Sequence, residues 1–321
     1  MLDIKITDKQ SGCKIDKFLQ EKYKVSFIQL QKFFRNKDIK VNNKKVDSKY
    51  KLQAGDIVLI NDFCENVLAN ILDEQNKQNE QNKNNINYSL LEKVKQSIIF
   101  NDENLLVIDK PFGLSVQGGS GIKTSLDDLL PYLSNNKDEH LKLVHRLDRD
   151  TTGVLLIAKN QQVADLLSKQ IRNKKDISKE YLAVVDGKFN NAEGKIELPL
   201  IKKYENNIEK VYVDKMYGKE AITLYKVIDY NEKLNISLVL VKILTGRTHQ
   251  IRVHMKEIGH PIIGDFKYGK LSSKSISNAM LLHSYRTKLN FLGKKYNFLS
   301  KIPNNFLKLF QNNATFSMKN I

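Results

Sequence analysis

The sequence predicts an α+β fold with a mainly antiparallel, mixed sheet, preceded by a small basic α/β module. Two observations carry this prediction. Residues 98–321 contain several apolar runs of strand length but few amphipathic helical patterns. Residues 1–60 combine two short helical patterns with short strands, and an Asn/Gln-rich stretch separates the two parts. The chain therefore divides into three segments, 1–60, 61–97 and 98–321.

Size and charge agree with this division. The 321 residues are enough for two domains, and 41% of them are hydrophobic, as in a soluble globular protein. The 53 Lys and Arg residues exceed the 36 Asp and Glu residues and give a net charge of +17. A field of that sign attracts polyanions such as RNA or DNA. A genome-wide composition bias towards Lys is the alternative explanation, so the charge alone does not decide the function.

The sequence also limits the compartment. No apolar run approaches the roughly 20 residues that cross a bilayer, and the first five residues lack the apolar core of a signal peptide. The two cysteines, Cys13 and Cys64, have no metal-binding spacing. We therefore expect a cytoplasmic protein without membrane contact, with both thiols free.

The first segment predicts two helices and a small sheet. Residues 14–21 place Ile15, Phe18 and Leu19 at helical spacing. Ser26 followed by Gln29 forms a capping-box pattern that opens a second helix. The predicted strands follow at residues 38–41, 44–46 and 57–60.

Residues 12–60 resemble the S4 RNA-binding domain. The resemblance is carried by Ile15-Asp16-Lys17-Phe18-Leu19, Ile39-Lys40-Val41-Asn42 and Leu52-Gln53-Ala54-Gly55-Asp56. Where the family usually has Arg before the first block, this chain has Lys14, which keeps the charge but loses the planar fork. The resemblance implies an RNA-facing surface of Lys14, Lys17, Arg35, Lys37 and Lys40. The alternative is an ordinary solvated helix face.

The second segment predicts a flexible linker. Nine of the fourteen residues 74–87 are Asn or Gln, and Ile86 is the one apolar residue among them. Such a stretch has no face to bury, so we expect residues 61–97 to connect the two domains without a fixed structure.

The third segment predicts the larger domain, with few helices and several long strands. A helix is expected at residues 163–171. The expected strands lie at residues 98–100, 105–108, 154–158, 181–185 and 236–243.

A polar cluster lies directly before the apolar strand that begins at Val154. It reads His145-Arg146-Leu147-Asp148-Arg149-Asp150-Thr151-Thr152-Gly153. A glycosidase pair needs two carboxylates on opposite sides of a bond, which one short loop does not provide. One working carboxylate, Asp148, surrounded by cations is the simpler interpretation. Turn and cap roles for Asp148 and Asp150 are the alternative.

A second polar cluster follows a long predicted strand. It reads Thr245-Gly246-Arg247-Thr248-His249-Gln250-Ile251-Arg252-Val253-His254-Met255. The two histidines are five residues apart and lack accompanying ligands, so we expect no metal site. We interpret the mixture of cations and hydrogen-bond donors, including His249 and Arg252, as RNA or substrate contacts.

Taken together, the clusters resemble the RluA family of pseudouridine synthases across about residues 98–310. Six blocks match in order, which makes coincidence improbable. They are Asp109-Lys110-Pro111, His145 to Gly153, Lys179-Glu180-Tyr181, Gly246 to His254, Gly259 to Asp265 and Leu282-His283.

The resemblance implies a role for particular residues. Asp148 matches the family's catalytic aspartate, Tyr181 the tyrosine that stacks on the target base, and Arg247 the basic residue paired with the aspartate. Arg146 matches the arginine that enters the RNA helix as the uridine flips out. Leu282 matches an apolar residue that lines the pocket.

The implied reaction fits these residue types. Pseudouridylation breaks the N1–C1′ bond of uridine, rotates the uracil and rejoins it through C5. The product is an isomer, so no cofactor is expected. A carboxylate can trap or stabilise the electron-poor sugar carbon or abstract a sugar proton, and Arg247 would favour its charged form. Tyr181 offers a flat face for stacking and could relay the C5 proton.

Two departures from the family pattern concern Gln117, where many relatives have His, and Ser284, where Ala is usual. We expect neither to contact Asp148, Tyr181 or Arg247. The S4 module together with the catalytic blocks most resembles the members that act on the large (23S) ribosomal RNA. We expect that RNA as the partner of a monomer without a protein partner. Action on transfer RNA and a non-catalytic role in ribosome assembly stay as alternatives.

Overall fold

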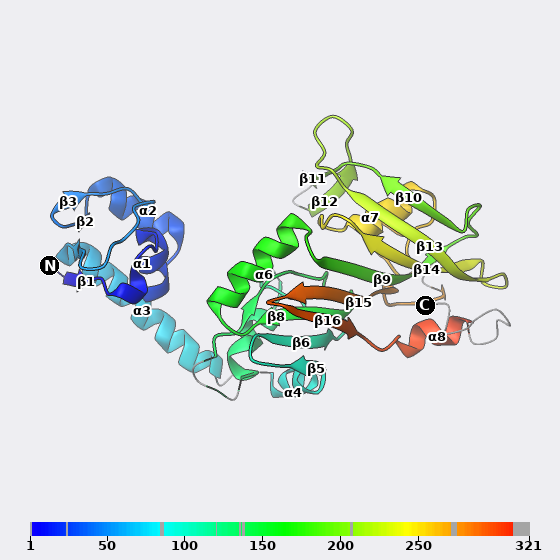
Figure 1. The fold of residues 1–321 in the computed structure, drawn as a ribbon, viewed down its shortest axis with the longest axis horizontal. Coiled ribbons are helices and arrows are strands. Elements are labelled where there is room, and N and C mark those ends of the chain that lie inside the picture. The colour runs from blue at the N-terminus through cyan, green and yellow to red at the C-terminus, as the bar shows by residue number, and fades with distance from the viewer. Residues whose placement is uncertain are drawn as a thin grey trace. The chain divides into compact units, whose positions relative to one another are not determined.

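The computed structural model describes residues 2–23, 25–83, 87–119, 121–134, 136, 139–205, 208–270 and 275–310. The chain divides into two compact units, Met1–Ile86 and Asn87–Ile321. Each unit has its own sheet and its own buried core (Figure 1).

The N-terminal unit contains the predicted pair of helices and a four-stranded antiparallel sheet in the order β1-β4-β2-β3. The Ser26–Gln29 capping box is present, because the Ser26 side chain accepts from the Gln29 amide and Gln29 accepts from the Ser26 amide. The elements are β1 (Leu2–Lys5), η1 (Asp8–Gln10), α1 (Ile15–Tyr23), α2 (Phe27–Asn36), β2 (Ile39–Val41), β3 (Lys44–Lys45), β4 (Ile57–Ile60) and α3 (Asp62–Lys83).

The polar segment after this sheet corrects the expectation of a flexible linker over residues 61–97. Helix α3 covers Asp62–Lys83, and α4 (Tyr88–Gln96) follows within the second unit. The Asn61 side chain accepts from the Cys64 amide at 2.8 Å, and Cys64 and Leu68 are fully buried in the N-terminal core. Gln is a good helix former, so a polar continuation extends a helix that its first turns anchor. Residues 84–86 lie outside the described part.

The C-terminal unit is built around a ten-stranded sheet. Its main path runs β10-β13-β14-β9-β15-β8-β6-β5, with β16 paired to β15 and β7 paired to β8. The strands are β5 (Ile98–Asn101), β6 (Leu105–Lys110), β7 (Lys142–Leu143), β8 (Thr152–Ala158), β9 (Ile177–Asp186), β10 (Glu193–Glu197), β13 (Ile222–Asn231), β14 (Ile236–Ile243), β15 (Leu282–Phe291) and β16 (Lys294–Leu299). Each predicted strand of this segment lies inside one of them.

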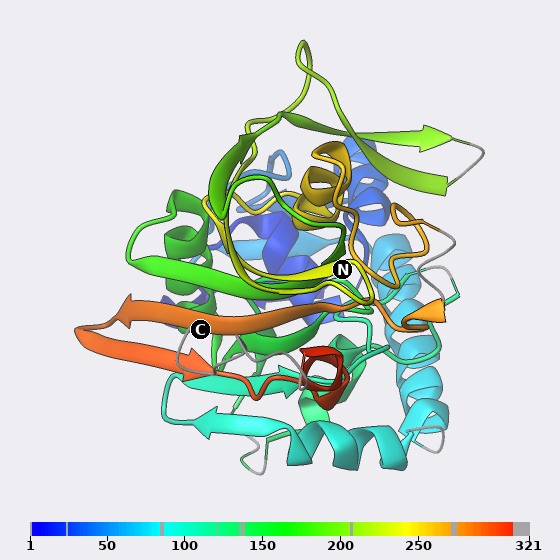
Figure 2. The same cartoon turned by 90° about the vertical axis from the view of Figure 1, so that its right-hand side faces the viewer.

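The sheet confirms the predicted α+β class. Among the described strand pairs of this sheet, β15 and β8 run parallel, and the other pairs are antiparallel. The β15–β16 hairpin projects beyond the neighbouring strands (Figure 2). The remaining elements of the unit are α5 (Leu126–Leu129), η2 (Leu130–Tyr132), α6 (Gln161–Asn173), β11 (Leu200–Glu205), β12 (Ile208–Val213), α7 (Gln250–Glu257) and α8 (Asn304–Phe310).

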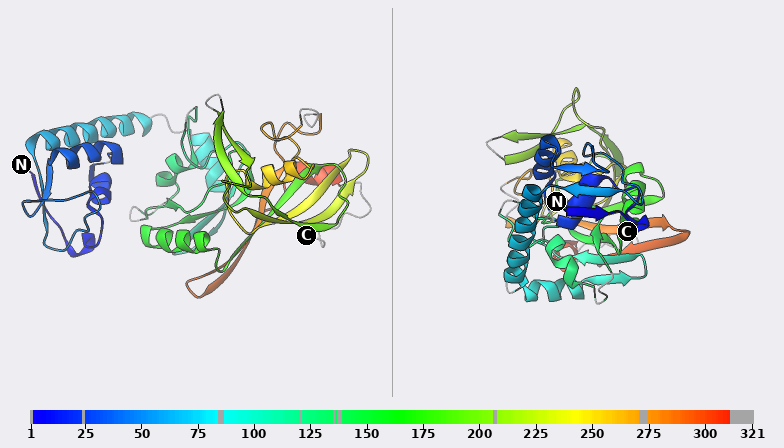
Figure 3. Two further views of the ribbon diagram at one scale, coloured as in Figure 1. Left: turned by 90° about the horizontal axis from the view of Figure 1, so that it is seen from above. Right: turned by 90° about the vertical axis from the view of Figure 1, so that its left-hand side faces the viewer.

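Three helices cover the sheet through separate apolar clusters. Helix α6 buries Val163 and Leu167 against residues of β6, β8 and β15. Helix α8 buries Phe306 and Phe310 against β9 and β14. Helix α7 packs Val253 against the β11–β12 hairpin, which stands apart as its own two-stranded sheet (Figures 2 and 3). Because α7 contains residues 250–255 of the second polar cluster, its packing against the hairpin fixes the position of that part of the cluster.

The parallel contact between β8 and β15 depends on Gly153. This residue has φ +105°, and a Cβ there would lie 2.2 Å from the Ser284 carbonyl oxygen. Only glycine allows both the backbone conformation and the close approach. The contact brings the loop that carries Asp148 next to the start of β15, where Leu282 lies.

Lys110, at the end of β6, holds the same loop through hydrogen bonds to backbone carbonyl oxygens. Its side chain is completely buried, and its ammonium group donates to the carbonyl oxygens of Pro111, Leu114 and Arg149 at 2.9, 2.8 and 2.9 Å. Three acceptors use all three ammonium protons. Because Arg149 follows Asp148 directly, the lysine holds the backbone of the polar loop in place.

We expect Lys110→Met to lower the free energy of unfolding by about 2–5 kcal/mol, because buried carbonyls would lose their donor. Chemical denaturation of the full-length chain, followed by circular dichroism, would measure the change. Lys142→Met, at an exposed lysine of β7, is the matched control and should change stability little. Equal stability of the two variants would contradict the supporting role of Lys110.

Candidate active site

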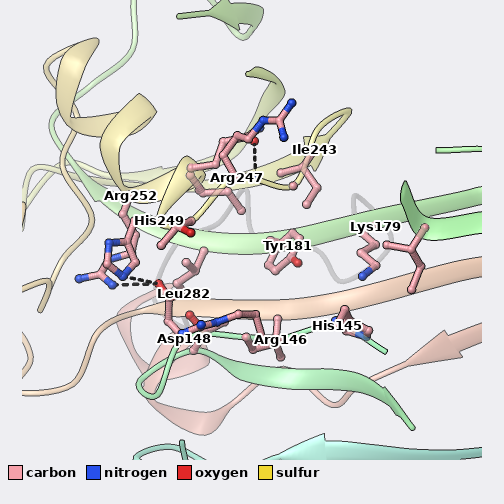
Figure 4. A pocket seen from close by; sticks show the side chains of 17 residues that line it. His145, Arg146, Asp148, Lys179, Tyr181, Ile243, Arg247, His249, Arg252 and Leu282 are labelled. Atoms are coloured by element: carbon pink, nitrogen blue, oxygen red, sulfur yellow. Dashed lines mark hydrogen bonds and ion pairs between the residues drawn. The ribbon is translucent and has the colours of Figure 1, made fainter. Parts of the chain in front are cut away.

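The predicted site residues of the larger domain line one cavity of about 290 Å³. Five segments contribute to it: the loop before β8, the end of α6, strand β9, the segment from the end of β14 into α7, and the start of β15 (Figure 4). The structure thereby brings together residues that lie more than a hundred positions apart in the sequence. The predicted residues found there are Asp148, Tyr181, Arg247, Arg146, Leu282, His249 and Arg252.

Asp148 is paired with Arg252. The Arg252 Nη1 atom lies 2.8 Å from Asp148 Oδ2, while Nε and Nη2 of the same guanidinium contact the two carboxylate oxygens of Asp265 at 2.7 and 2.8 Å. The guanidinium also lies over the Tyr268 ring, 5.0 Å from its centroid. A planar fork with three occupied donors has one orientation, so Asp148 is held in a defined position.

This pairing corrects the expected role of Arg247. Arg247 is exposed, and its Nε atom donates to the Glu220 carbonyl oxygen at 2.9 Å instead of to Asp148. The physical reason is the start of α7 at Gln250, which turns Arg252 to the buried side of the helix and leaves Arg247 in the preceding loop. Arg252, expected as an RNA contact, is the ion-pair partner, and Arg247 remains a lining residue of the cavity.

The charges of the pair are secured by their surroundings. Burial opposes the charged form of Arg252, but the contacts with Asp265 and Asp148 outweigh it and raise its pKa above the usual value. Burial would likewise raise the pKa of Asp265, yet the hydrogen bonds and charge of Arg252 hold that pKa below its usual range. Arg252 therefore stays protonated, and Asp148 faces a permanent positive charge.

Tyr181 lies on β9 with its side chain almost fully buried in the cavity wall. Burial raises the pKa of its hydroxyl, a side-chain hydrogen bond with Ser284 opposes this, and the charge of Asp148 adds to the increase. The phenol therefore stays protonated at neutral pH. The contact with Ser284 also corrects our expectation that this departure from the family pattern would not touch Tyr181.

His249 lies beside the same carboxylate and is oriented by hydrogen bonds on its other side. The Val211 amide donates to the Tyr268 hydroxyl oxygen at 3.0 Å, and that hydroxyl lies 2.8 Å from His249 Nδ1. His249 Nε2 lies 3.9 Å from Asp148 Oδ2. Burial lowers the pKa of His249 to about 4, although Asp148 opposes the shift, so the ring is neutral at pH 7. When the Tyr268 hydroxyl donates its proton to Nδ1, that nitrogen is the acceptor. The single proton of the neutral imidazole then lies on Nε2, towards the cavity.

The last two predicted residues have different exposures. Arg146 is exposed at the cavity rim, whereas Leu282 is buried in its wall with 4% of its surface accessible. Neighbouring His145 accepts from the Leu156 amide through Nε2 at 3.0 Å, which fixes the start of the polar loop to β8.

Sequence reasoning missed four residues of this site. Asp265 and Lys179 stand inside blocks that matched the family but were given no role. His145 opens the catalytic block, and Tyr268 lies three residues after Asp265. Their parts depend on contacts across the fold, which no local pattern reports.

In the N-terminal unit, four of the five expected RNA-facing cations are exposed, and Lys40 is half-buried. Lys37 and Lys40 lie near Lys45, whose pKa is lowered by a side-chain contact with Lys37 and by the charges of Lys37 and Lys40. We call these three residues the β2–β3 lysine cluster. Lys14 and Lys17 stand three residues apart at the start of α1, so they project from neighbouring positions of that helix.

Within the described ranges, no three His, Cys, Asp or Glu side chains come together as a possible metal site. Among the helices in those ranges, none combines the length and apolar character that crossing a membrane requires.

Comparisons with known proteins place this cavity in a protein class. Residues 104–257 match the family described as RNA pseudouridylate synthase. That range contains the aspartate loop, the tyrosine strand and the helix that supplies Arg252. The chain belongs to this family and is an RNA pseudouridine synthase.

Relatives extend the match over most of the chain. The ribosomal large subunit pseudouridine synthase C of Buchnera aphidicola subsp. Schizaphis graminum is 35% identical, with 93% of each chain covered. The protein of the same name from Rickettsia bellii is 35% identical over 91% of this chain and 95% of its own. The solved human RNA Pseudouridylate Synthase Domain Containing 4 superimposes with a TM-score of 0.59 at 27% identity, covering 70% of this chain and 95% of that chain. The family resemblance read from the sequence is confirmed.

We expect Arg252→Gln to lower activity far more than Arg247→Gln. The first change leaves two partly buried carboxylates without their cation. Removing one partner of a buried ion pair costs about 3–5 kcal/mol of stability, so Asp148 should lose its fixed position. The second removes an exposed cation and should mainly weaken RNA binding. Release of tritium from [5-³H]uridine-labelled RNA and filter binding would measure the two effects. Equal losses of turnover in the two variants would contradict the assigned pairing.

The same change should alter acid stability. Because the pKa of Asp265 is depressed in the folded protein, its contribution is present above its unfolded value of about 3.9 and is lost as pH falls through the lower, folded value. Without Arg252 the largest causes of this depression are lost, and only the backbone hydrogen bonds from Lys267 and Tyr268 still lower the pKa of Asp265. The midpoint of acid unfolding should therefore move to higher pH in Arg252→Gln and stay unchanged in Arg247→Gln.

Proposed function

We propose that this enzyme converts selected uridines of large-subunit ribosomal RNA to pseudouridine, with Asp148 as the catalytic carboxylate. The observation that carries the proposal is the position of Asp148, fixed in the cavity by Arg252 at 2.8 Å. The names of the relatives from Buchnera and Rickettsia support large-subunit RNA as the substrate. The composition agrees, because a net charge of +17 favours a polyanionic partner.

The chemistry assigned to Asp148 follows from its charge. When the N1–C1′ bond breaks, its electron pair leaves with the uracil and C1′ becomes electron-poor. The Asp148 carboxylate stabilises that carbon or takes a proton from the sugar. The uracil then turns, and C5 bonds to C1′ and loses its proton. N1, which kept the electron pair of the broken bond, takes up one proton from solvent, and any proton taken from the sugar is returned to it. Atoms balance without a cofactor, because the product is an isomer of the substrate.

Access to the cavity requires that the uridine leave the RNA stack. Exposed Arg146 stands at the rim, where it is placed to occupy the vacated position in the RNA helix. Tyr181 presents a ring in the wall for stacking, and Leu282 supplies an apolar surface. Unstacking costs a few kcal/mol, so loops and junctions should be favoured over perfect helices. The protonated Tyr181 hydroxyl acts in this scheme as a donor and not as a base.

The N-terminal unit has a separate part in the proposal. In the β2–β3 lysine cluster, the charges of Lys37 and Lys40 act on Lys45 and lower its pKa, an arrangement of like charges that binding of phosphates would stabilise. We assign it the role of anchoring RNA, in keeping with the resemblance to the S4 domain. Lys14, Lys17 and Arg35 are assigned to the same RNA-facing role.

Asp148→Asn should abolish modification while leaving the fold and RNA binding in place. The amide has nearly the same shape but carries no charge, so we expect a loss of roughly 10³-fold or more, the order found when a catalytic group is removed. The measurement is chemical labelling and primer extension on unmodified large-subunit ribosomal RNA. New stops at a few uridines with the unaltered enzyme alone are the expected result.

The same assay distinguishes the substrates. Unmodified transfer RNA and assembly intermediates of the large subunit are tested in parallel with naked ribosomal RNA. Stops confined to transfer RNA would replace the proposed substrate. Equal modification by Asp148→Asn would remove Asp148 from the catalytic role.

Replacing the β2–β3 lysine cluster by alanine (Lys37→Ala, Lys40→Ala and Lys45→Ala together) should weaken RNA binding by the full-length enzyme. Each lost phosphate contact should reduce the slope of log K against log salt by roughly 0.7–0.9. The rate with RNA bound should be unchanged. Lys5→Ala, on β1 at the opposite edge of the same sheet, is the control. An unaltered salt slope in the triple variant would remove the cluster from the RNA contact.

A further inference from the structure

Lys179 is the one lysine that lines the catalytic cavity, among the residues the structure describes. It lies on β9 two residues before Tyr181, and side chains two apart on a strand project from the same face. Figure 4 shows the order along the cavity: Asp148, then Tyr181, then Lys179. The lysine therefore stands beyond the stacking ring, at the end of the cavity away from the carboxylate.

No carboxylate compensates Lys179 in the described part of the chain. Its sequence neighbour Glu180 faces the opposite side of β9 and accepts from Arg286 Nε at 2.6 Å. Its cross-strand neighbours are Ile243 on β14 and Thr287 on β15, neither of which ionises. Nearby His145 is neutral, because burial and the charge of Lys179 lower its pKa well below the usual value. A half-buried ammonium group without an anion is costly unless a ligand supplies one.

The reaction supplies such an anion at this place. A uracil ring that stacks on Tyr181 with C1′ at Asp148 directs its far edge towards Lys179. When the N1–C1′ bond breaks, the electron pair passes into the uracil ring and spreads over its carbonyl oxygens. We propose that the Lys179 ammonium group contacts the carbonyl-bearing edge of the flipped uracil and stabilises the negative charge of the departing base. This inference rests on the proposed function and adds to Asp148 and Tyr181 a further catalytic residue, one that acts on the departing base.

The protonation of Lys179 gives the inference a measurable consequence. Burial lowers the pKa of Lys179 to about 7. Of the other groups around it, His145 and His249 stay neutral at pH 7 and the Tyr181 phenol stays protonated. The further cations are Arg146 and Arg247 in the cavity, and Lys174 and Lys242 on the adjoining surface. Lys110, outside the cavity, also has a pKa lowered by burial to about 7.

The experiment uses full-length enzyme and an unmodified large-subunit ribosomal RNA transcript labelled with [5-³H]uridine, under single-turnover conditions. Three variants are compared: Lys179→Met, Lys179→Arg and, as the control, Lys242→Met on the neighbouring strand. We expect Lys179→Met to slow tritium release by about 10²–10³-fold, as when one donor to a developing anion is removed. RNA affinity should change by less than about threefold, and the salt slope should stay constant, because no phosphate contact is lost.

Lys179→Arg keeps the charge and should recover most of the rate. The value of kcat/KM for the unaltered enzyme should fall above about pH 7, as free Lys179 loses its proton. This alkaline limb should be absent in Lys179→Arg, because the guanidinium stays charged. A limb that persists in Lys179→Arg would belong to another group, such as Lys110, and would overturn the inference. Because Met replaces a buried ammonium by an apolar chain of similar length, thermal unfolding should show a folded variant.

The outcomes separate this inference from the function on which it rests. An unaltered enzyme that releases no tritium from the transcript would contradict the proposed substrate, whatever the variants do. Active unaltered enzyme with a Lys179→Met variant within threefold of its rate would overturn the role of Lys179 alone. A loss of RNA affinity equal to the loss of rate, with a smaller salt slope, would make Lys179 a phosphate contact and also overturn the inference.

Discussion

The structure of the site depends on one guanidinium group. Arg252 uses three nitrogen atoms to contact two carboxylates, Asp148 before β8 and Asp265 after α7. These segments are far apart in the sequence, and the ion pairs fix their separation. The arrangement is a partly buried cluster of two negative charges and one positive charge, so its net charge is negative. A single arginine thereby positions the reactive carboxylate without neutralising both carboxylates. The remaining negative charge can stabilise an electron-poor sugar carbon.

Contacts other than the Asp148–Arg252 ion pair also hold the aspartate loop. Lys110 donates a hydrogen bond to the Arg149 carbonyl oxygen of the loop. His145, the first residue of the loop, accepts from the Leu156 amide of β8. Gly153 permits β8 to approach β15 closely enough for the parallel pairing. The carboxylate is therefore aimed before substrate arrives, which spares the reorganisation that water would need around a developing charge. The matched block from His145 to Gly153 contains both reacting and supporting residues for this reason.

Local patterns predicted most of the elements, and the family resemblance predicted which residues line the cavity, but neither predicted the partners within it. Alternating and continuous apolar runs identified strands such as β8 and β14, because burial of a strand face leaves a direct trace in the sequence. The sequence did not show that Arg252, and not Arg247, pairs with Asp148. Both are cations, they stand five residues apart, and the start of α7 decides which one faces the buried side. Helix α3 was missed because an Asn/Gln-rich stretch has no apolar face of its own, and its anchors, Cys64 and Leu68, belong to the core of the preceding sheet.

The charges along the cavity correspond to the charges of the reaction. At one end the cluster of Asp148, Arg252 and Asp265 carries a net negative charge, and at the other end Lys179 is uncompensated among the described groups. Heterolysis of the N1–C1′ bond makes the sugar positive and the base negative. In the proposed pose the sugar lies at the Asp148 end and the base at the Lys179 end. A field with this polarity lowers the energy of the separated charges more than that of the neutral uridine, which is the condition for catalysis. Between the two ends, the Tyr181 ring can hold the uracil during its rotation without favouring either nitrogen or carbon as the attachment point, because stacking does not depend on the orientation of the base in its plane.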